Sequence, residues 1–174
     1  LADDMGLGKT VQVLALLESR RIAQPGKPTL IVLPKSLIFN WYNEAQKFTP
    51  EMSIAIHTGA NRDKSCGNFL NCNIVITTYG TLSRDIEQLS KQRFDYCILD
   101  EAQAIKNSGT TTFKAVRLIN ADYRLTMTGT PIENSINDLF SQLEFLNPGL
   151  LNSSFKTSTK LNNAQIQQLA QSIS

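Results

Sequence analysis

Short apolar runs alternate with segments of helical periodicity along most of this 174-residue chain. Apolar runs of this kind are typical of strands buried in a parallel sheet, and the helical segments between them supply the crossover connections. The pattern predicts an α/β fold in which helices cover both faces of a mostly parallel sheet, as three layers. The expected strands are residues 29–33, 54–57, 73–78, 94–99 and 124–128, and the expected helices are residues 9–21, 36–48, 82–89, 111–119 and about 135–146.

A glycine-rich segment close to the start of the chain ends in Lys-Thr, where the first helix is expected to begin. In such a loop, backbone N–H groups and the helix N-terminus surround phosphate oxygens. Lys9 can reach the β- and γ-phosphates, and the Thr10 hydroxyl can coordinate Mg²⁺. Asp3 stands where this pattern usually begins with glycine, so the segment is a variant of the phosphate loop. The residues predicted to bind the nucleotide are Met5, Gly6, Leu7, Gly8, Lys9, Thr10 and Val11.

A pair of carboxylates, Asp100 and Glu101, follows the expected strand at residues 94–99. Asp100 is placed to hold Mg²⁺, and Glu101 beside it is placed to orient a water molecule. A phosphate loop followed later in the chain by such a pair predicts a site for ATP and Mg²⁺. The prediction requires that the Lys9 ammonium and the Asp100 side chain face one cleft, although they are far apart in sequence.

Composition places few limits on the partner of this chain. With 17 basic and 15 acidic side chains the formal net charge is +2, and 41% of the residues are hydrophobic. These values exclude a disordered or strongly basic chain, so local contacts would have to hold any nucleic acid. The length suits one domain with a substantial core. No apolar run is long enough to span a membrane, and the start has no signal-peptide pattern.

The cysteines and the only histidine are expected to have structural roles. The three cysteines have no metal-ligand spacing, and Cys97 lies inside an apolar strand, which indicates a small buried hydrophobe. This cysteine usage favours a reducing, intracellular setting. His57 ends a short strand before a turn, so a satisfied structural role is favoured over catalysis or metal binding.

The only tryptophan, Trp41, is predicted to be a core residue. It shares one stripe of a helix with Leu37, Ala45 and Phe48, and Ser36 is placed to cap the start of that helix. An aromatic residue on such a stripe is more often buried than available for stacking on a nucleic-acid base.

The chain begins at Leu1, directly before the phosphate loop, although such loops connect a buried strand to a helix. Only Leu1 and Ala2 remain to represent that strand, which indicates a piece of a longer protein. Residues 1–150 are expected to form one ATP-binding lobe that is truncated at its N-terminal edge. Residues 151–174, rich in polar side chains with one Gln-rich amphipathic stretch, are expected to begin a connector.

Five segments of the chain, in this order, resemble the motifs of the Snf-type (Swi/Snf-like) DNA translocases of helicase superfamily two. The first is the phosphate loop, and the fourth is the carboxylate pair in the form Asp-Glu-Ala-Gln. The last segment reads LTMTGTPIENSINDLFSQLEFLNP and is the most specific, because few other ATPases place Thr-Gly-Thr-Pro before such a helix. The five segments are residues 3–10, 30–41, 76–82, 100–107 and 125–148.

The resemblance implies a RecA-like P-loop NTPase lobe that pairs, across the nucleotide, with a second lobe of the same parent chain. The family implies movement along double-stranded DNA and remodelling of protein–DNA complexes without necessarily separating the strands. The resemblance places Gln103 among the catalytic residues and implies that it transmits a change in the bound nucleotide to the DNA-facing side. Thr128, Gly129 and Thr130 resemble the element that couples ATP to DNA, since hydroxyls at a strand end can exchange hydrogen bonds with the carboxylate strand beside them.

For DNA, the resemblance indicates contacts at two strand ends. At the carboxyl edge of a parallel sheet, helix N-termini and hydroxyls can receive phosphate oxygens, and such contacts carry no base identity. Binding is therefore expected to depend weakly on sequence and strongly on salt. The residues predicted to contact DNA are Pro34, Lys35, Ser36, Thr77, Thr78, Tyr79, Gly80 and Lys106.

Two other functions remain open from the sequence. An RNA helicase lobe shares the phosphate loop and the carboxylate pair. A non-catalytic module that binds nucleotide or DNA could have the same ancestry, although intact Lys9, Asp100 and Glu101 argue against degeneration. A DNA translocase would be expected in the cytoplasm or on the nucleoid of a bacterium, or in the nucleus of a eukaryote.

Overall fold

The computed structural model describes residues 1, 8–23, 26–105, 109–129 and 136–149. Within these ranges the α-helices are α1 Lys9–Ala23, α2 Ile38–Phe48, α3 Tyr79–Leu89, α4 Thr111–Leu118 and α5 Ile136–Leu146. The strands are β1 Thr29–Leu33, β2 Ile54–His57, β3 Ile74–Thr78, β4 Arg93–Leu99 and β5 Asn120–Thr126, with short 3₁₀ turns η1 Lys35–Leu37, η2 Gly67–Asn71 and η3 Ala102–Ile105.

The five described strands form one parallel sheet in the order β2-β3-β1-β4-β5. In the centre, Leu30 of β1 lies between Val75 of β3 and Cys97 of β4. All five residues of β1 are buried, as expected for a central strand covered on both faces. Because every strand runs the same way, the residues that follow β1, β3, β4 and β5 meet at one edge of the sheet.

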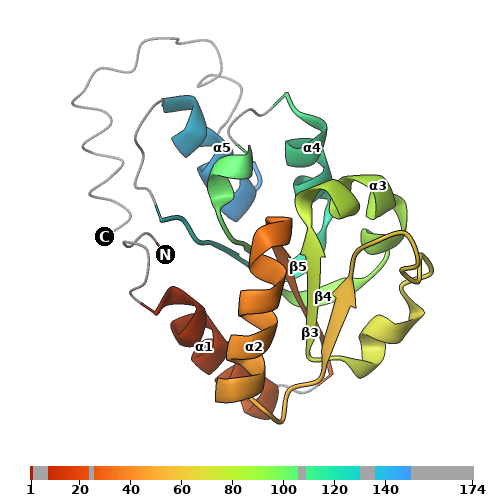
Figure 1. The fold of residues 1–174 in the computed structure, drawn as a ribbon. Coiled ribbons are helices and arrows are strands. Elements are labelled where there is room, and N and C mark those ends of the chain that lie inside the picture. The colour runs from red at the N-terminus through yellow and green to blue at the C-terminus, as the bar shows by residue number, and fades with distance from the viewer. Residues whose placement is uncertain (2–7, 24–25, 106–108, 130–135, 150–174) are drawn as a thin grey trace.

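Helices cover both faces of this sheet (Figure 1). Alternate residues of β1 point to opposite faces, so Ile31 joins a core layer with Leu14 of α1 and Trp41 of α2, whereas Val32 joins another layer with Leu82 of α3. Phe113 of α4 and Phe145 of α5 belong to the second layer. The predicted three-layer α/β fold is therefore confirmed.

Leu1 extends the hydrogen bonding of the sheet beyond β5. Its amino group donates to the Thr126 carbonyl at 2.7 Å, and its carbonyl accepts from the Thr128 N–H at 3.2 Å. The two partners of Leu1 lie on either side of Met127, which is the pattern of hydrogen bonding between parallel strands. Leu1 is thus held at the carboxyl end of β5, next to the element that follows this strand.

Three local predictions are wrong. Ser36 does not cap a helix, because it lies inside η1, whose N-cap is Pro34, and α2 then begins at Ile38 without a side-chain cap. Phe48 is 46% exposed rather than core, since α2 ends at this residue and its buried residues are Trp41 and Ala45.

The predicted strand at residues 124–128 is also misplaced. β5 runs from Asn120 to Thr126, so it begins four residues earlier and ends two residues earlier than expected. Its first half carries exposed polar residues at the side of the sheet, which hides the strand from an apolar pattern. Thr78 and Thr110 do cap helices, because each hydroxyl accepts the N–H three residues further on.

The structural roles predicted for Cys97 and His57 are confirmed. Cys97 is fully buried in β4, and this burial raises the pKa of its thiol to about 12, so it stays a neutral hydrophobe. The buried His57 ring contacts the Asp85 carboxylate, Nε2 to Oδ2, at 2.9 Å. Within the described helices, no segment has both the length and the hydropathy needed to cross a bilayer.

Candidate active site

Gly8, the last glycine of the predicted phosphate loop, leads into α1 at the carboxyl edge of the sheet. Gly8 has a φ of +76°, a left-handed conformation that glycine adopts readily, and its carbonyl accepts the first helical bond from the Gln12 N–H at 3.0 Å. The first turn of α1 contains no acidic residue, and the N–H groups at a helix N-terminus favour an anion. Lys9, Thr10 and Val11 form this turn and are half-buried. Met5, Gly6 and Leu7 lie outside the described residues.

Asp100 directly follows β4 and keeps its place in the sheet, because its N–H donates to the Val32 carbonyl at 2.9 Å. The residue is only 7% exposed, and each carboxylate oxygen has one described donor. The Trp41 indole Nε1–H donates to Oδ2 at 2.7 Å, and the Glu101 backbone N–H donates to Oδ1 at 2.9 Å. The carboxylate is therefore oriented from two sides.

Burial is the main reason why the pKa of Asp100 lies above its ordinary value. The hydrogen bonds from Trp41 and from the Glu101 N–H oppose this shift, the Glu101 charge adds to it, and the positive charge of Lys9 opposes it. Lys9 therefore lies within electrostatic reach of Asp100. The first turn of α1 and the end of β4 are therefore close enough for their charges to interact.

Glu101 has a left-handed backbone, with a φ of +50°. A non-glycine residue in this region costs about 1–2 kcal/mol, and such strain is concentrated at functional sites. The Glu101 carboxylate accepts from the Gln103 amide at 2.5 Å, and the Gln103 oxygen accepts from the Thr128 hydroxyl at 3.4 Å. A line of side chains thus joins the carboxylate pair to the residues after β5. Gly129 is half-buried beside Thr128, and Thr130 lies outside the described residues.

The donor set fits Mg²⁺ and a polyphosphate. Mg²⁺ prefers oxygen ligands and is usually held by one or two protein groups together with phosphate oxygens and water. The Asp100 carboxylate and the Thr10 hydroxyl are such oxygen donors, and the described hydrogen-bond donors to the buried Asp100 carboxylate are both neutral N–H groups. A cation is the charge that this carboxylate needs to stay ionised in a buried place.

The segment predicted to contact DNA after β1 is open to solvent. Lys35 and Ser36 are exposed and Pro34 is half-buried, and together they lead from β1 into α2. The two exposed side chains are available to a phosphate backbone. Lys106, the other lysine predicted to contact DNA, lies outside the described residues.

The corresponding segment after β3 is more enclosed. The Thr77 hydroxyl is buried and donates to the His57 carbonyl at 2.8 Å, and the Tyr79 hydroxyl donates to the Asp100 carbonyl at 2.8 Å. Thr78 caps α3 and donates to the Thr81 hydroxyl at 2.9 Å, while Gly80 is exposed. Thr77 and Tyr79 thus use their hydroxyls inside the protein, which leaves Thr78 and Gly80 nearer to solvent.

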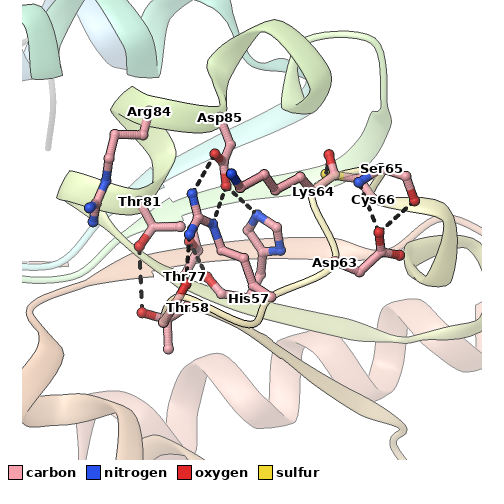
Figure 2. A network of polar contacts seen from close by, with 12 residues as sticks. His57, Thr58, Asp63, Lys64, Ser65, Cys66, Thr77, Thr81, Arg84 and Asp85 are labelled. Atoms are coloured by element: carbon pink, nitrogen blue, oxygen red, sulfur yellow. Dashed lines mark hydrogen bonds and ion pairs between the residues drawn. The ribbon is translucent and has the colours of Figure 1, made fainter.

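A second buried carboxylate, Asp85, was not singled out in the sequence. Figure 2 shows Asp85 of α3 pointing toward His57, and Arg62 also contacts it, with Nη2 at 2.7 Å from Oδ1. Chiefly the Arg62 hydrogen bonds, and then that of His57, hold the pKa of Asp85 below its ordinary value. The signal was present, because Asp85 lies between Leu82 and Leu89 on the inner stripe of α3, where a carboxylate needs partners.

The roles that Trp41 and Tyr79 play at Asp100 were also missed. The sequence indicated a core tryptophan and a DNA-facing tyrosine, and the structure places both as donors to Asp100, one to its side chain and one to its carbonyl. No pattern in a single sequence joins residues that lie so far apart in the chain.

The N-terminus of a helix and a buried carboxylate both lie at the carboxyl edge of this parallel sheet. This arrangement is that of a nucleotide-binding lobe of the RecA-like class. The family comparison is more specific. The family model described as "SNF2-related domain" matches residues 1–173, and the chain belongs to this family.

Relatives and a solved structure agree with this assignment. The Bacillus subtilis protein named "Putative ATP-dependent helicase/translocase YwqA" is 40% identical over 157 residues, which cover 88% of this chain and 17% of that protein. The TATA-binding protein-associated factor MOT1 of Saccharomyces cerevisiae is 35% identical over 165 residues, covering 87% of this chain and 9% of MOT1. The chain thus spans less than a fifth of the length of these relatives.

The fold is also that of a solved relative. The SWI2/SNF2 ATPase core of Sulfolobus solfataricus, solved in complex with double-stranded DNA, superposes with a TM-score of 0.85 at 40% sequence identity. The match covers 97% of this chain and 37% of that one. This TM-score and this coverage support the RecA-like assignment at the level of the fold.

Proposed function

We propose that the full-length protein is an ATP-dependent translocase on double-stranded DNA that remodels protein–DNA complexes, and that this chain supplies its first RecA-like lobe. The observation that carries the proposal is that the buried Asp100 follows β4 at the carboxyl edge of the sheet, where α1 begins, and that the positive charge of Lys9 in the first turn of α1 acts on its pKa. The relatives named as helicases or translocases, and the ATPase core solved with DNA, support it.

The nucleotide would bind at the start of α1. The N–H groups of Gly8 and of the first turn of α1, together with Met5, Gly6, Leu7 and Val11, would surround the phosphates. The Lys9 ammonium would pair with the β- and γ-phosphate oxygens. Thr10 and Asp100 would hold Mg²⁺, which neutralises negative charge on the phosphate oxygens when it is bound.

Glu101 would orient the water that attacks the γ-phosphate. Its backbone is left-handed directly after the end of β4, and the Gln103 amide holds one carboxylate oxygen. The other oxygen can then accept a proton from water. Because Gln103 also meets Thr128, a change at the nucleotide would move the residues after β5, and Gly129 and Thr130 would continue that coupling.

The DNA would lie along the carboxyl edge of the sheet. Of the described residues predicted to contact DNA, Lys35, Ser36 and Gly80 are exposed and Thr78 is half-buried, so these four could reach phosphate oxygens. Pro34, Thr77 and Tyr79 would shape the edge, and Lys106 would add charge. Contacts of this kind read the backbone rather than the bases.

A second lobe would complete the site. Residues 1–150 would form the first lobe and residues 151–174 would lead toward the second. An arginine supplied from outside a nucleotide site accelerates phosphoryl transfer by about 10³–10⁵-fold. This lobe by itself should therefore hydrolyse ATP very slowly.

Phosphate release by the full-length protein, measured with and without duplex DNA, tests the proposal. We expect stimulation by duplex DNA, which the Lys9→Ala and Glu101→Gln substitutions reduce by at least about a hundredfold. Glu87→Gln, the same chemical change at an exposed position of α3, is the matched control. Full stimulated activity in Glu101→Gln would remove the role in orienting water.

The two alternative functions give different results in the same assay. Stimulation by single-stranded RNA but not by duplex DNA would favour an RNA helicase. Binding of nucleotide without release of phosphate, under every condition, would favour a non-catalytic module.

A further inference from the structure

Trp41 is the only tryptophan of the chain, and its indole N–H is joined to the carboxylate of Asp100. The distance from Nε1 to Oδ2 is 2.7 Å, and Trp41 is 2% exposed. A buried indole N–H usually finds an acceptor, but a backbone carbonyl would satisfy that need. Here the acceptor is the carboxylate to which the proposed function assigns Mg²⁺.

We propose that Trp41 is a positioning residue for Mg²⁺-dependent nucleotide binding, acting through the orientation of the Asp100 carboxylate. The inference rests on the proposed function, because it concerns the same site. It adds a residue from α2, an element that contributes neither the phosphate loop nor the carboxylate pair.

The hydrogen bonds around Asp100 leave its side chain little freedom. Trp41 holds Oδ2, the Glu101 N–H holds Oδ1 at 2.9 Å, and the Tyr79 hydroxyl holds the Asp100 carbonyl at 2.8 Å. An ionised carboxylate has about four lone-pair positions, so two of them remain for a metal ion or its water. Without the indole N–H, Oδ2 would lose a donor and the carboxylate could rotate about its last bond.

The position of Trp41 is itself fixed by packing. The ring belongs to the core layer that contains Leu14, Leu17 and Ile31, from α1 and β1. A donor held in this way does not need to be ordered when the metal binds. Hydrogen-bond partners of metal ligands typically contribute about 10–100-fold to metal affinity or activity.

The Trp41→Phe substitution removes the N–H and keeps an aromatic ring. Calorimetric titration of the full-length protein with ADP, in the presence and absence of Mg²⁺, measures the effect on each kind of binding. We expect affinity for MgADP to fall by about tenfold or more, and affinity for ADP without metal to stay within about twofold of that of the unaltered protein. Tyr42→Phe, at a residue of the same helix with 36% exposure, is the matched control and should change neither value.

The outcomes separate this inference from the proposed function. If Trp41→Phe binds MgADP as tightly as the unaltered protein, Trp41 is only a core residue and the inference is overturned. Equal losses with and without Mg²⁺ would also overturn it, because they would indicate damage to packing. If the unaltered protein does not bind MgADP, both the proposed function and the inference fail.

The indole N–H resonance assigned to Trp41 in the ¹⁵N-labelled full-length protein gives a second measurement that does not need a stable Trp41→Phe variant. In Asp100→Asn the charged acceptor of the indole is removed, so this resonance of the metal-free protein should shift relative to the unaltered protein. MgADP should shift the same resonance in the unaltered protein and leave it in place in Asp100→Asn. An identical position of the Trp41 resonance in the two metal-free proteins would show that the indole does not sense the carboxylate, and would overturn the inference.

Discussion

Two carboxylates of this lobe are almost equally buried but have opposite surroundings. Asp85 is 8% exposed and Asp100 is 7% exposed. Asp85 is paired with the Arg62 guanidinium and with His57, and its pKa lies below the ordinary value. Among its described hydrogen-bond partners Asp100 has neutral donors only, and its pKa lies above the ordinary value because of burial.

We interpret the difference as that between a structural carboxylate and the carboxylate proposed to hold the metal ion. Asp85 has its cation inside the protein, so its bonds attach the loop after β2 to α3 (Figure 2). Asp100 lacks a direct cation among those hydrogen-bond partners, and the Lys9 charge acts on it from nearby. A buried carboxylate without a directly bonded cation favours the binding of a metal ion. Comparing the two aspartates therefore tests the assignment of the site without reference to any relative.

The largest expected effect is on catalysis. Asp100→Asn should reduce DNA-stimulated phosphate release by the full-length protein by more than about a hundredfold, since even partners of metal ligands contribute 10–100-fold. Thermal denaturation without metal should show no loss of stability, because the substitution removes a buried charge that lacks a direct cation. Loss of activity accompanied by a large fall in Tm would contradict the comparison, since it would make Asp100 a structural residue.

The converse effect is expected at Asp85. Asp85→Asn should lower the free energy of unfolding by about 2 kcal/mol, because the donors of Arg62 and His57 lose a charged acceptor. Urea denaturation measures this change. Metal-dependent nucleotide affinity, measured under conditions where the variant is folded, should stay unchanged. A loss of Mg²⁺ dependence in this variant would erase the distinction between the two carboxylates.

The two aspartates should also give opposite pH dependence of stability in the metal-free protein. The lowered pKa of Asp85 means that its stabilisation is present above the unfolded-state value of about 4, and is lost as pH falls through the folded value. For Asp100 the folded value is raised, so its contribution is present below about pH 4 and is lost as pH rises through the folded value.

Urea denaturation at a series of pH values measures both slopes. The deficit of Asp85→Asn should shrink below about pH 4, and Asp100→Asn should gain stability over the unaltered protein as pH rises above about 4. If the stability of both variants, relative to the unaltered protein, changed in the same direction with pH, the proposed contrast between the surroundings of Asp85 and Asp100 would be wrong.

The smallest expected effect concerns DNA. Two exposed lysines allow a matched comparison. Lys35 follows β1 at the predicted DNA edge, and Lys64 lies in the loop near Asp85. Lys35→Ala should weaken binding of duplex DNA a few-fold and reduce the salt slope by about one, because one phosphate contact is lost. Lys64→Ala should change neither quantity. Equal effects of the two substitutions would show that DNA binding is not localised at the predicted strand ends.

The sequence was sufficient for those features that depend on local pattern. β1 was placed correctly because its five residues are all apolar or β-branched and all buried. The phosphate loop and the carboxylate pair could be predicted because each is a short motif whose residues follow one another at fixed spacing. β5 was misplaced because exposed polar residues such as Asp122 and Tyr123 interrupt the apolar pattern at the side of the sheet.

Other features required the tertiary structure. The bonds from Trp41 and Tyr79 to Asp100 join segments that only the sheet order brings together. The exposure of Phe48 follows from the end of α2, which a helical stripe does not reveal. The pairing of Asp85 with Arg62 is likewise a contact between a loop and a helix.

A crystal structure of the full-length protein with MgADP tests the central claim most directly. We expect the diphosphate at the N-terminus of α1, with the Lys9 ammonium on a β-phosphate oxygen. Mg²⁺ should lie between the Thr10 hydroxyl and the Asp100 carboxylate. The carboxylate should contact the ion directly or through one water molecule. A nucleotide bound elsewhere, or bound at α1 with its metal out of reach of Asp100, would contradict the account.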